Sequence, residues 1–210
     1  MADEDLLLLT PAEARIFGCL IEKKQVTPDV YPLTLNALHA AANQKTARDP
    51  VMALEQGEVQ QALKSLERKG LVRQMFGSRV ERYEHLAVQH FSLTTPQAAI
   101  LGLLLLRGPQ TAYELLARSE RMARFQSVED LKSELDMLIG KRPPLVGEIG
   151  RGPGQREDRY AHLLCGPIDL AAITPQRAAS ASPVLDLEAR IDALEAEVAA
   201  LRARLETLGG

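Results

Sequence analysis

Apolar residues recur at helical spacing in two successive sets of segments, and each set predicts three helices. The third helix of each set has the clearest pattern, with apolar side chains at positions i, i+4 and i+7. These residues are Val59, Leu63 and Leu66 in the first set and Leu131, Leu135 and Leu138 in the second. Gly70 and Gly140 follow the two patterns, and glycine is common just past a helix end. Each third helix is therefore expected to bury one face in a core.

Threonine marks the expected starts of several helices. Thr10-Pro11 opens the first helix of the first set, and Thr95-Pro96 opens that of the second. Threonine caps a helix N-terminus and proline is tolerated in the first turn, so both pairs are good helix starts. The second helices are expected within 33–42 and from Thr111 onward.

A short apolar strand and a glycine-containing turn follow each third helix, and then comes a segment that occurs twice. The pattern R-x-(E/D)-R-Y-x-H-L spans 79–86 and recurs 77 positions later at 156–163. Three helices followed by a β-hairpin are typical of a winged helix. The sequence therefore predicts a mainly α protein with small β-hairpins (α+β), built from two tandem winged-helix domains at 1–90 and 91–166.

The repeated segment has a structural and a functional interpretation. In the structural one, Tyr83 and Tyr160 cover the core while arginine and acidic residues pair across the hairpin. In the functional one, arginines of the segment reach the phosphate backbone of a nucleic acid from the wing. The sequence leaves both open.

The end of the chain changes character. Residues 167–183, rich in Ala, Ser, Thr and Pro, are expected to form a linker. Residues 184–208 are expected to form a coiled-coil helix, because apolar residues alternate at steps of three and four. The expected dimerisation positions are Val184, Leu187, Ile191, Leu194, Val198, Leu201 and Leu205. β-Branched residues and leucines alternate at the first six of these positions, which favours a parallel homodimer. The alternative is a helix that packs on the domains of its own chain.

Composition narrows the class of partner. The chain of 210 residues has a formal net charge of −3, which argues against a strongly basic nucleic-acid binder or a polybasic membrane protein. The longest apolar run, 98–106, is far shorter than the roughly 20 residues that a transmembrane helix requires. No membrane association is expected, and the protein is predicted to be soluble and cytoplasmic. Local charge can still create a binding surface.

The first copy concentrates basic residues around its third helix and its wing. Between residues 64 and 82, six basic residues outnumber two acidic ones, and such a patch is typical of a surface that contacts phosphates. Two further basic residues lie in the loop before the helix. The expected DNA-binding residues are Lys45, Arg48, Lys64, Arg68, Arg73, Arg79 and Arg82.

The second copy is a poor candidate for the same role. Its third helix carries four acidic residues against Lys132 alone, and a phosphate-lined groove would repel such a helix. The acidic residues are Glu129, Asp130, Glu134 and Asp136. A structural or protein-contacting role is therefore expected for the second copy.

Catalytic and metal-binding patterns are not evident. The histidines have no metal-ligand spacing, and Cys19 lies among apolar residues, which favours a core position over a nucleophile. The glycines of 150–154 lie in an expected hairpin and do not open a helix, so a phosphate-binding loop is disfavoured. No enzymatic activity, metal or cofactor is expected. The four histidines are His39, His85, His90 and His162.

Two segments carry a family resemblance. Residues 31–36 (Y-P-L-T-L-N) and 43–52 (N-Q-K-T-A-R-D-P-V-M) resemble the characteristic stretch of the YceH-like family of bacterial proteins, and the similarity continues to 156–163. The resemblance implies tandem winged-helix domains, and it implies no biochemical activity. The expected function is therefore that of a non-enzymatic, DNA-binding, transcription-regulator-like protein. The alternative is a protein-interaction scaffold built from tandem winged helices without DNA binding.

Overall fold

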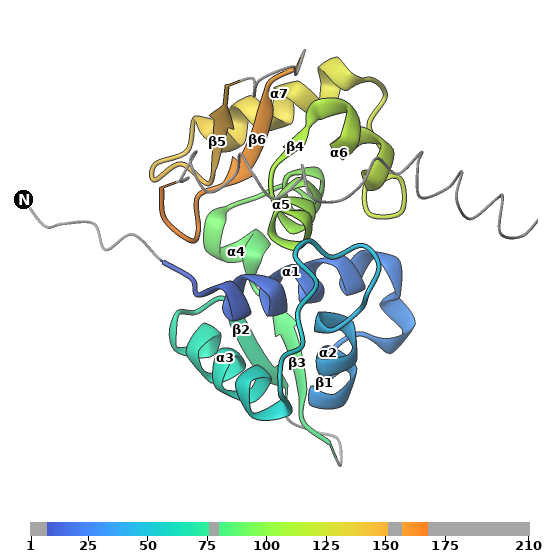
Figure 1. Ribbon diagram of the computed structural model, residues 1–210, viewed down its shortest axis with the longest axis vertical. Helices are drawn as coiled ribbons and strands as arrows, with labels where there is room; N and C mark the ends of the chain where they lie inside the picture. The colour runs from blue at the N-terminus through green and yellow to red at the C-terminus, as the bar shows by residue number, and fades with distance from the viewer. Residues whose placement is uncertain (1–7, 76–79, 151–156, 168–210) are drawn as a thin grey trace, which may run out of the picture. The chain divides into compact units, whose positions relative to one another are not determined.

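The computed structural model describes residues 8–75, 80–150 and 157–167, and these residues belong to one compact unit (Figure 1). Within them the structure is mainly helical, with two small antiparallel sheets of three strands each. The predicted class, mainly α with small β-hairpins, is confirmed. The seven expected coiled-coil positions between Val184 and Leu205, and Arg79 of the expected wing, lie outside the described residues.

The two halves of the described chain repeat the same order of elements: helix, short strand, helix, helix, strand, strand. The first copy contains α1 (Pro11–Val26), the 3₁₀ turn η1 (Pro28–Val30), β1 (Leu33–Thr34), α2 (Leu35–Ala42), α3 (Gln56–Arg68), β2 (Val72–Met75) and β3 (Arg82–His85). A short helix, α4 (Ala87–Phe91), connects the copies. The second copy contains α5 (Thr95–Arg107), β4 (Gln110–Thr111), α6 (Ala112–Ser119), α7 (Val128–Ile139), β5 (Val146–Ile149) and β6 (Arg159–His162).

The sheets have the same topology and register in both copies. Their strand orders are β1-β3-β2 and β4-β6-β5, and all pairs are antiparallel. Tyr83 of β3 lies opposite Leu33, and Tyr160 of β6 lies opposite Gln110 at the equivalent position. Both tyrosine side chains are buried. The repeated sequence is therefore also a structural repeat, and its tyrosines cover the core as the structural interpretation expects.

Reciprocal hydrogen bonds fix where the first helices begin. The Thr10 hydroxyl accepts a hydrogen bond from the Glu13 amide at 3.2 Å, and the Glu13 carboxylate accepts one from the Thr10 amide at 2.7 Å. In α5 the cap is Thr94, one residue before the expected start at Thr95. The reason is that Gln97 completes a capping box only with the threonine three residues earlier, as a 3.3 Å bond from its amide to the Thr94 hydroxyl shows.

The first helices of the two copies pack against each other, and the copies share one hydrophobic core. Figure 1 shows α1 and α5 between the sheets of the two copies. Two glycines allow the helices to approach closely. A Cβ added to Gly18 would lie 3.0 Å from Leu105 Cβ, and one added to Gly102 would lie 2.8 Å from Ile21 Cγ2. The expected boundary after residue 90 falls within α4. The two copies also share a hydrophobic core, which the sequence does not reveal.

Replacing Gly102 with alanine tests the α1–α5 contact. The new methyl group would overlap Ile21, and overpacking of this kind costs about 1–3 kcal/mol, against a gain in helix propensity of up to about 1 kcal/mol. We expect Gly102→Ala to lower the free energy of unfolding measured by urea denaturation. Adding Ile21→Leu, which removes the overlapping methyl branch, should recover part of the loss.

Gly57→Ala is the matched control, because an added Cβ there meets no atom within 4 Å. This exposed helical position should show no loss of stability. If Gly102→Ala were as stable as Gly57→Ala, the tight contact between α1 and α5 would be ruled out.

Candidate nucleic-acid interface

Helix α3 buries one face and exposes the other. Val59, Leu63 and Leu66 lie in the core, so the side chains on the opposite side face solvent. Four exposed residues follow one another along that side at helical spacing. They are Gly57, Gln61, Lys64 and Arg68. This exposed side has no acidic residue in its central stripe, and its C-terminal half is basic.

Lys64 and Arg68 are free to meet a ligand. Both side chains are exposed, and within the described part of the chain neither makes a hydrogen bond or an ion pair. Lys45, in the loop before α3, is also exposed, and it too makes no hydrogen bond or ion pair within the described part of the chain. Three of the expected DNA-binding residues therefore form no ion pair within the part of the chain that the structure describes.

Lys69, the next basic residue after Arg68, has a different role. Its ammonium group donates to the Glu13 carboxylate at 2.6 Å and to the Leu8 carbonyl at 2.8 Å. Burial opposes ionisation of Glu13, but hydrogen bonds from Lys69, Ser65 and Thr10 outweigh burial and keep the pKa of this carboxyl below its ordinary value. Lys69 therefore ties the start of α1 to the end of α3, and its charge is compensated.

The expectation for Arg48 needs correction. Its side chain is buried, and its guanidinium donates two hydrogen bonds to Glu22, at 3.1 and 2.6 Å, and one to the Ala41 carbonyl at 3.1 Å. Burial opposes ionisation of Glu22, but the bonds and charge of Arg48 keep the pKa of that carboxyl below its ordinary value. Arg48 has no surface from which to contact a phosphate, and it holds the loop between α2 and α3 against α1.

A second buried arginine, Arg15 of α1, holds the same loop. Its guanidinium donates to the Ala42 carbonyl at 3.1 Å and to the Pro50 carbonyl at 2.6 Å. The Asp49 amide also donates to the Leu106 carbonyl of α5 at 2.9 Å, so the loop contacts both copies. The sequence gives one indication of this role. Arg15 directly precedes Ile16 in a helix, and the residues around it are apolar.

The hairpin strands β2 and β3 of the first copy carry both paired and accessible arginines. Arg73 and Glu84 lie opposite each other on β2 and β3 and form an ion pair, with the Arg73 Nε atom 2.8 Å from the carboxylate. The Arg73 side chain nevertheless remains more than half exposed, at 59%. Arg82 donates to the Pro32 carbonyl at 2.7 Å. This bond positions Arg82 without neutralising its charge, because a carbonyl carries no net charge.

The third helix of the second copy presents the opposite charge. Matching the buried leucines at the centres of α3 and α7 places Asp136 where α3 has Lys64. In the same register Glu129 lies where α3 has Gly57. Both acidic side chains are exposed. The predicted charge contrast between the two helices therefore lies on their solvent-facing sides.

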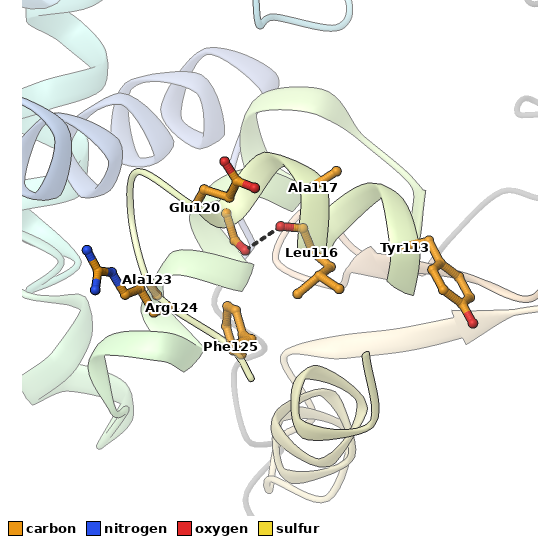
Figure 2. Close-up of a pocket in the computed structure, with 8 residues that line it drawn as sticks. Tyr113, Leu116, Ala117, Glu120, Ala123, Arg124 and Phe125 are labelled. Atoms are coloured by element: carbon orange, nitrogen blue, oxygen red, sulfur yellow. Dashed lines mark hydrogen bonds between the residues drawn. The ribbon is translucent and has the colours of Figure 1, made fainter. Parts of the chain in front are cut away.

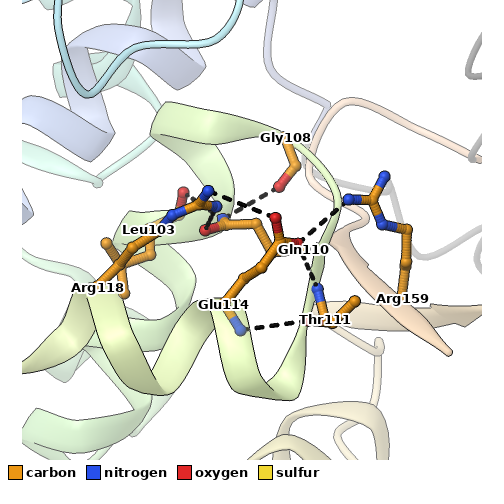
Figure 3. A network of polar contacts seen from close by, with 7 residues as sticks. All are labelled: Leu103, Gly108, Gln110, Thr111, Glu114, Arg118 and Arg159. Carbon is orange, nitrogen blue, oxygen red and sulfur yellow. Dashed lines mark hydrogen bonds and ion pairs between the residues drawn. The ribbon is translucent and has the colours of Figure 1, made fainter. Parts of the chain in front are cut away.

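In the second copy, the described arginine of the β5–β6 hairpin is neutralised by a carboxylate. Arg159 occupies the position of Arg82 and donates to the Glu114 carboxylate at 3.1 Å (Figure 3). Glu114 also accepts from Arg118 at 3.4 Å, and Arg118 donates to the Gln110 side chain at 2.7 Å. Burial opposes ionisation of Glu114, but a backbone hydrogen bond and the two arginines keep its pKa below the ordinary value. Arg118 and Arg159 therefore form ion pairs within the second copy.

A groove opens between α6 and the loop that follows it. It has a volume of about 750 Å³, and Figure 2 shows Leu116 and Phe125 in its middle, with Tyr113 toward one end and Arg124 toward the other. At the matching place, the first copy has polar contacts. There His39, which corresponds to Leu116, lies with its Nε2 atom 2.9 Å from the Leu54 carbonyl. Asn36, which corresponds to Tyr113, accepts a hydrogen bond from the Gln56 side chain.

Two histidines and one cysteine considered in the sequence are buried or, for His162, partly buried. Burial lowers the pKa of His85 to about 3 and that of His162 to about 4, so both rings are neutral at physiological pH. Burial raises the pKa of the Cys19 thiol to about 11, and its core position is as expected. Among the described residues, no group of three or more His, Cys, Asp or Glu side chains is placed to hold a metal ion.

Replacing Arg48 with methionine tests whether this residue serves the fold. The change leaves Glu22 without its buried partner, and we expect the free energy of unfolding to fall by on the order of 3 kcal/mol. Urea denaturation measures the loss, with the exposed Lys45→Met variant as a control that should be close to the wild type. An Arg48→Met variant as stable as Lys45→Met would contradict a stabilising role for the Arg48–Glu22 pair.

The chain is similar to a group of bacterial proteins along its length. Residues 9–155 match the family model described as "Protein of unknown function, DUF480". The UPF0502 protein mll4256 of Mesorhizobium japonicum is 77% identical over 207 residues, covering 99% of each chain. The UPF0502 protein XAC4278 of Xanthomonas axonopodis pv. citri is 52% identical over 215 residues, covering 96% of each.

These similarities agree with the resemblance to the YceH-like family seen in residues 31–36 and 43–52. In the part of the chain that the structure describes, no helix is long and apolar enough to cross a membrane. Both the family model and the full-length relatives identify the same group, and the chain belongs to the DUF480 (UPF0502) family of uncharacterised bacterial proteins.

Proposed function

We propose that this protein is a non-enzymatic, DNA-binding, transcription-regulator-like protein in which both copies are winged helices and the first copy contacts DNA. The observation that carries the proposal is the exposed side of α3, where Lys64 and Arg68 have no ionic partner among the described residues. In a winged helix the third helix is the element that enters the major groove. The order of elements in each copy supports this assignment.

The charges near α3 suit a phosphate backbone. Lys45 precedes the helix, and Arg73 and Arg82 lie on the strands that follow it. Basic side chains that replace condensed counterions supply most of the sequence-independent affinity for DNA. A chain with a net charge of −3 can use this effect only where basic residues are concentrated. The proposed contact residues are Lys45, Lys64, Arg68, Arg73, Arg79 and Arg82.

The apolar heptad positions of 184–208 add self-association to the proposal. A parallel pair of these segments would hold two first copies together, and tethering of this kind can raise overall affinity by about 10²–10⁴-fold. The Ala- and Pro-containing residues 167–183 would let each arm adjust to its site. A homodimer of this kind would make a DNA contact of modest affinity effective.

Substituting Lys64 with alanine tests the DNA contact. We expect weaker binding to every duplex regardless of sequence, and a decrease of about 0.9 in the slope of log affinity against log salt concentration, because one phosphate contact is lost. Fluorescence anisotropy with a labelled duplex over a range of salt concentrations measures both quantities. Lys132→Ala is the matched control, since Lys132 is an exposed lysine of α7 in the second copy.

Equal losses for Lys64→Ala and Lys132→Ala would contradict a contact confined to the first copy. Absence of binding to any duplex at low salt by the wild-type chain would contradict DNA binding altogether.

A second candidate function, protein docking by the second copy, is favoured by the groove beside α6. At the matching place of the first copy, His39 and Gln56 make polar contacts, whereas in the second copy apolar side chains line an open groove. An exposed apolar surface of this kind is typical of a site that contacts another protein. The exposed acidic side of α7 is compatible with such a role.

Tyr113→Asp separates this docking role from DNA binding. Tyr113 is 55% exposed and lines the groove, so an added charge should displace an apolar partner without unfolding the chain. We expect loss of a nuclease-resistant partner in pull-downs from the native cytoplasm, with unchanged affinity for duplex DNA. Met137→Asp, at an exposed residue of α7 that is not among the groove-lining residues, should retain the partner. Retention of the same partner by Tyr113→Asp would exclude the groove.

A further inference from the structure

The exposed side of α3 is chemically divided along the helix. Its N-terminal half carries Gly57, Gln60 and Gln61, which are uncharged, and its C-terminal half carries Lys64 and Arg68. The amide groups of Gln60 and Gln61 are exposed and make no hydrogen bond with the described residues. Each amide therefore keeps both a donor and an acceptor available for an external partner.

Other polar residues near the start of α3 are already engaged. The Glu58 carboxylate accepts a hydrogen bond from the Glu55 amide at 2.7 Å, which directs this acid to the helix end. The Gln56 side chain donates to Asn36 at 2.8 Å. Gln60 and Gln61 are thus the free amide side chains of this helix within the described chain.

Gly57 has no evident role in the folding of α3. An added Cβ would meet no atom within 4 Å, so packing does not require a glycine. Its backbone is not in the left-handed region either. Glycine in a helix is less favourable than alanine, and one established reason to keep it is close approach of a ligand to the backbone. The matching position of α7 carries Glu129.

We propose that Gln60 and Gln61 read base edges in the major groove and select adenine, while the absence of a side chain at Gly57 lets the start of α3 approach the bases. A glutamine amide can accept from adenine N6 and donate to adenine N7 at the same time. Lys64 and Arg68 hold the phosphate backbone and supply affinity without sequence preference. This inference rests on the proposed DNA binding of the first copy.

The division of labour predicts different effects for the two kinds of residue. Loss of a bidentate base contact reduces discrimination against a wrong base by about 5- to 150-fold. Loss of a phosphate contact weakens binding to all sequences alike. Gln61→Ala should therefore lower the preference for adenine, and Lys64→Ala should leave the preference unchanged.

The experiment is selection of duplexes from a random-sequence library by the full-length chain, followed by affinity measurements on the enriched duplex and on a duplex with each enriched adenine replaced. We expect the wild type to enrich adenine at one or more positions. The Gln60→Ala and Gln61→Ala variants should lose at least about five-fold of the discrimination at one such position and keep their affinity for the substituted duplex. Gln89→Ala is the control, because Gln89 is an exposed glutamine of α4.

Gly57→Leu tests the clearance. The open space around Gly57 accommodates the new side chain, so thermal stability should be unchanged or higher, while affinity for the enriched duplex should fall at least ten-fold. A wild type that binds duplex DNA without enriching adenine would overturn this inference and leave the proposed function standing. Glutamine variants that keep the full preference would do the same. A wild type that binds no duplex at low salt would overturn both.

Discussion

The contact between α1 and α5 determines how the rest of the described structure is assembled. Gly18 and Gly102 lie where these helices meet, and a methyl group at either position would come within 3.0 Å of a neighbouring side chain. Helices that approach this closely exclude water from a common core, which is the main source of stability in a small domain. Because α3 packs on α1, and α7 packs on α5, the shared core also fixes the orientation of both third helices.

The loop between α2 and α3 connects the shared core to the proposed DNA-binding helix α3. Arg15 and Arg48 are buried cations, and each satisfies backbone carbonyls that would otherwise lack partners. Glu22 balances the charge of Arg48. Residues 43–52, which carry the family resemblance, are therefore held against α1 in the loop before α3.

Local patterns in the sequence account for most of the elements. Helical periodicity predicts α3 and α7, and the repeated segment predicts the matching strands with Tyr83 and Tyr160. Two kinds of feature could not be predicted. The two-residue strands β1 and β4 are too short for any periodicity, and their pairing depends on partners far along the chain. The burial of Arg48 depends on Glu22, which lies in another element.

The candidate site was predictable to the extent that it depends on charge along one helix. The basic character of α3 and the acidic character of α7 are evident in the sequence, and the structure adds that Lys64 and Asp136 occupy matching exposed positions. The freedom of Gln60 and Gln61 becomes evident only when the engaged neighbours, such as Gln56, are seen. The two copies thus keep one fold while their exposed surfaces differ in charge and in shape.

NMR chemical-shift mapping of the full-length chain with a short DNA duplex tests the central claim most directly, because it reports on both copies in one sample. The account predicts concentration-dependent shifts that cluster in residues 57–68 and in β2 and β3, with residues 128–139 of α7 unchanged. Shifts centred on α7, or no shifts at low salt, would contradict it.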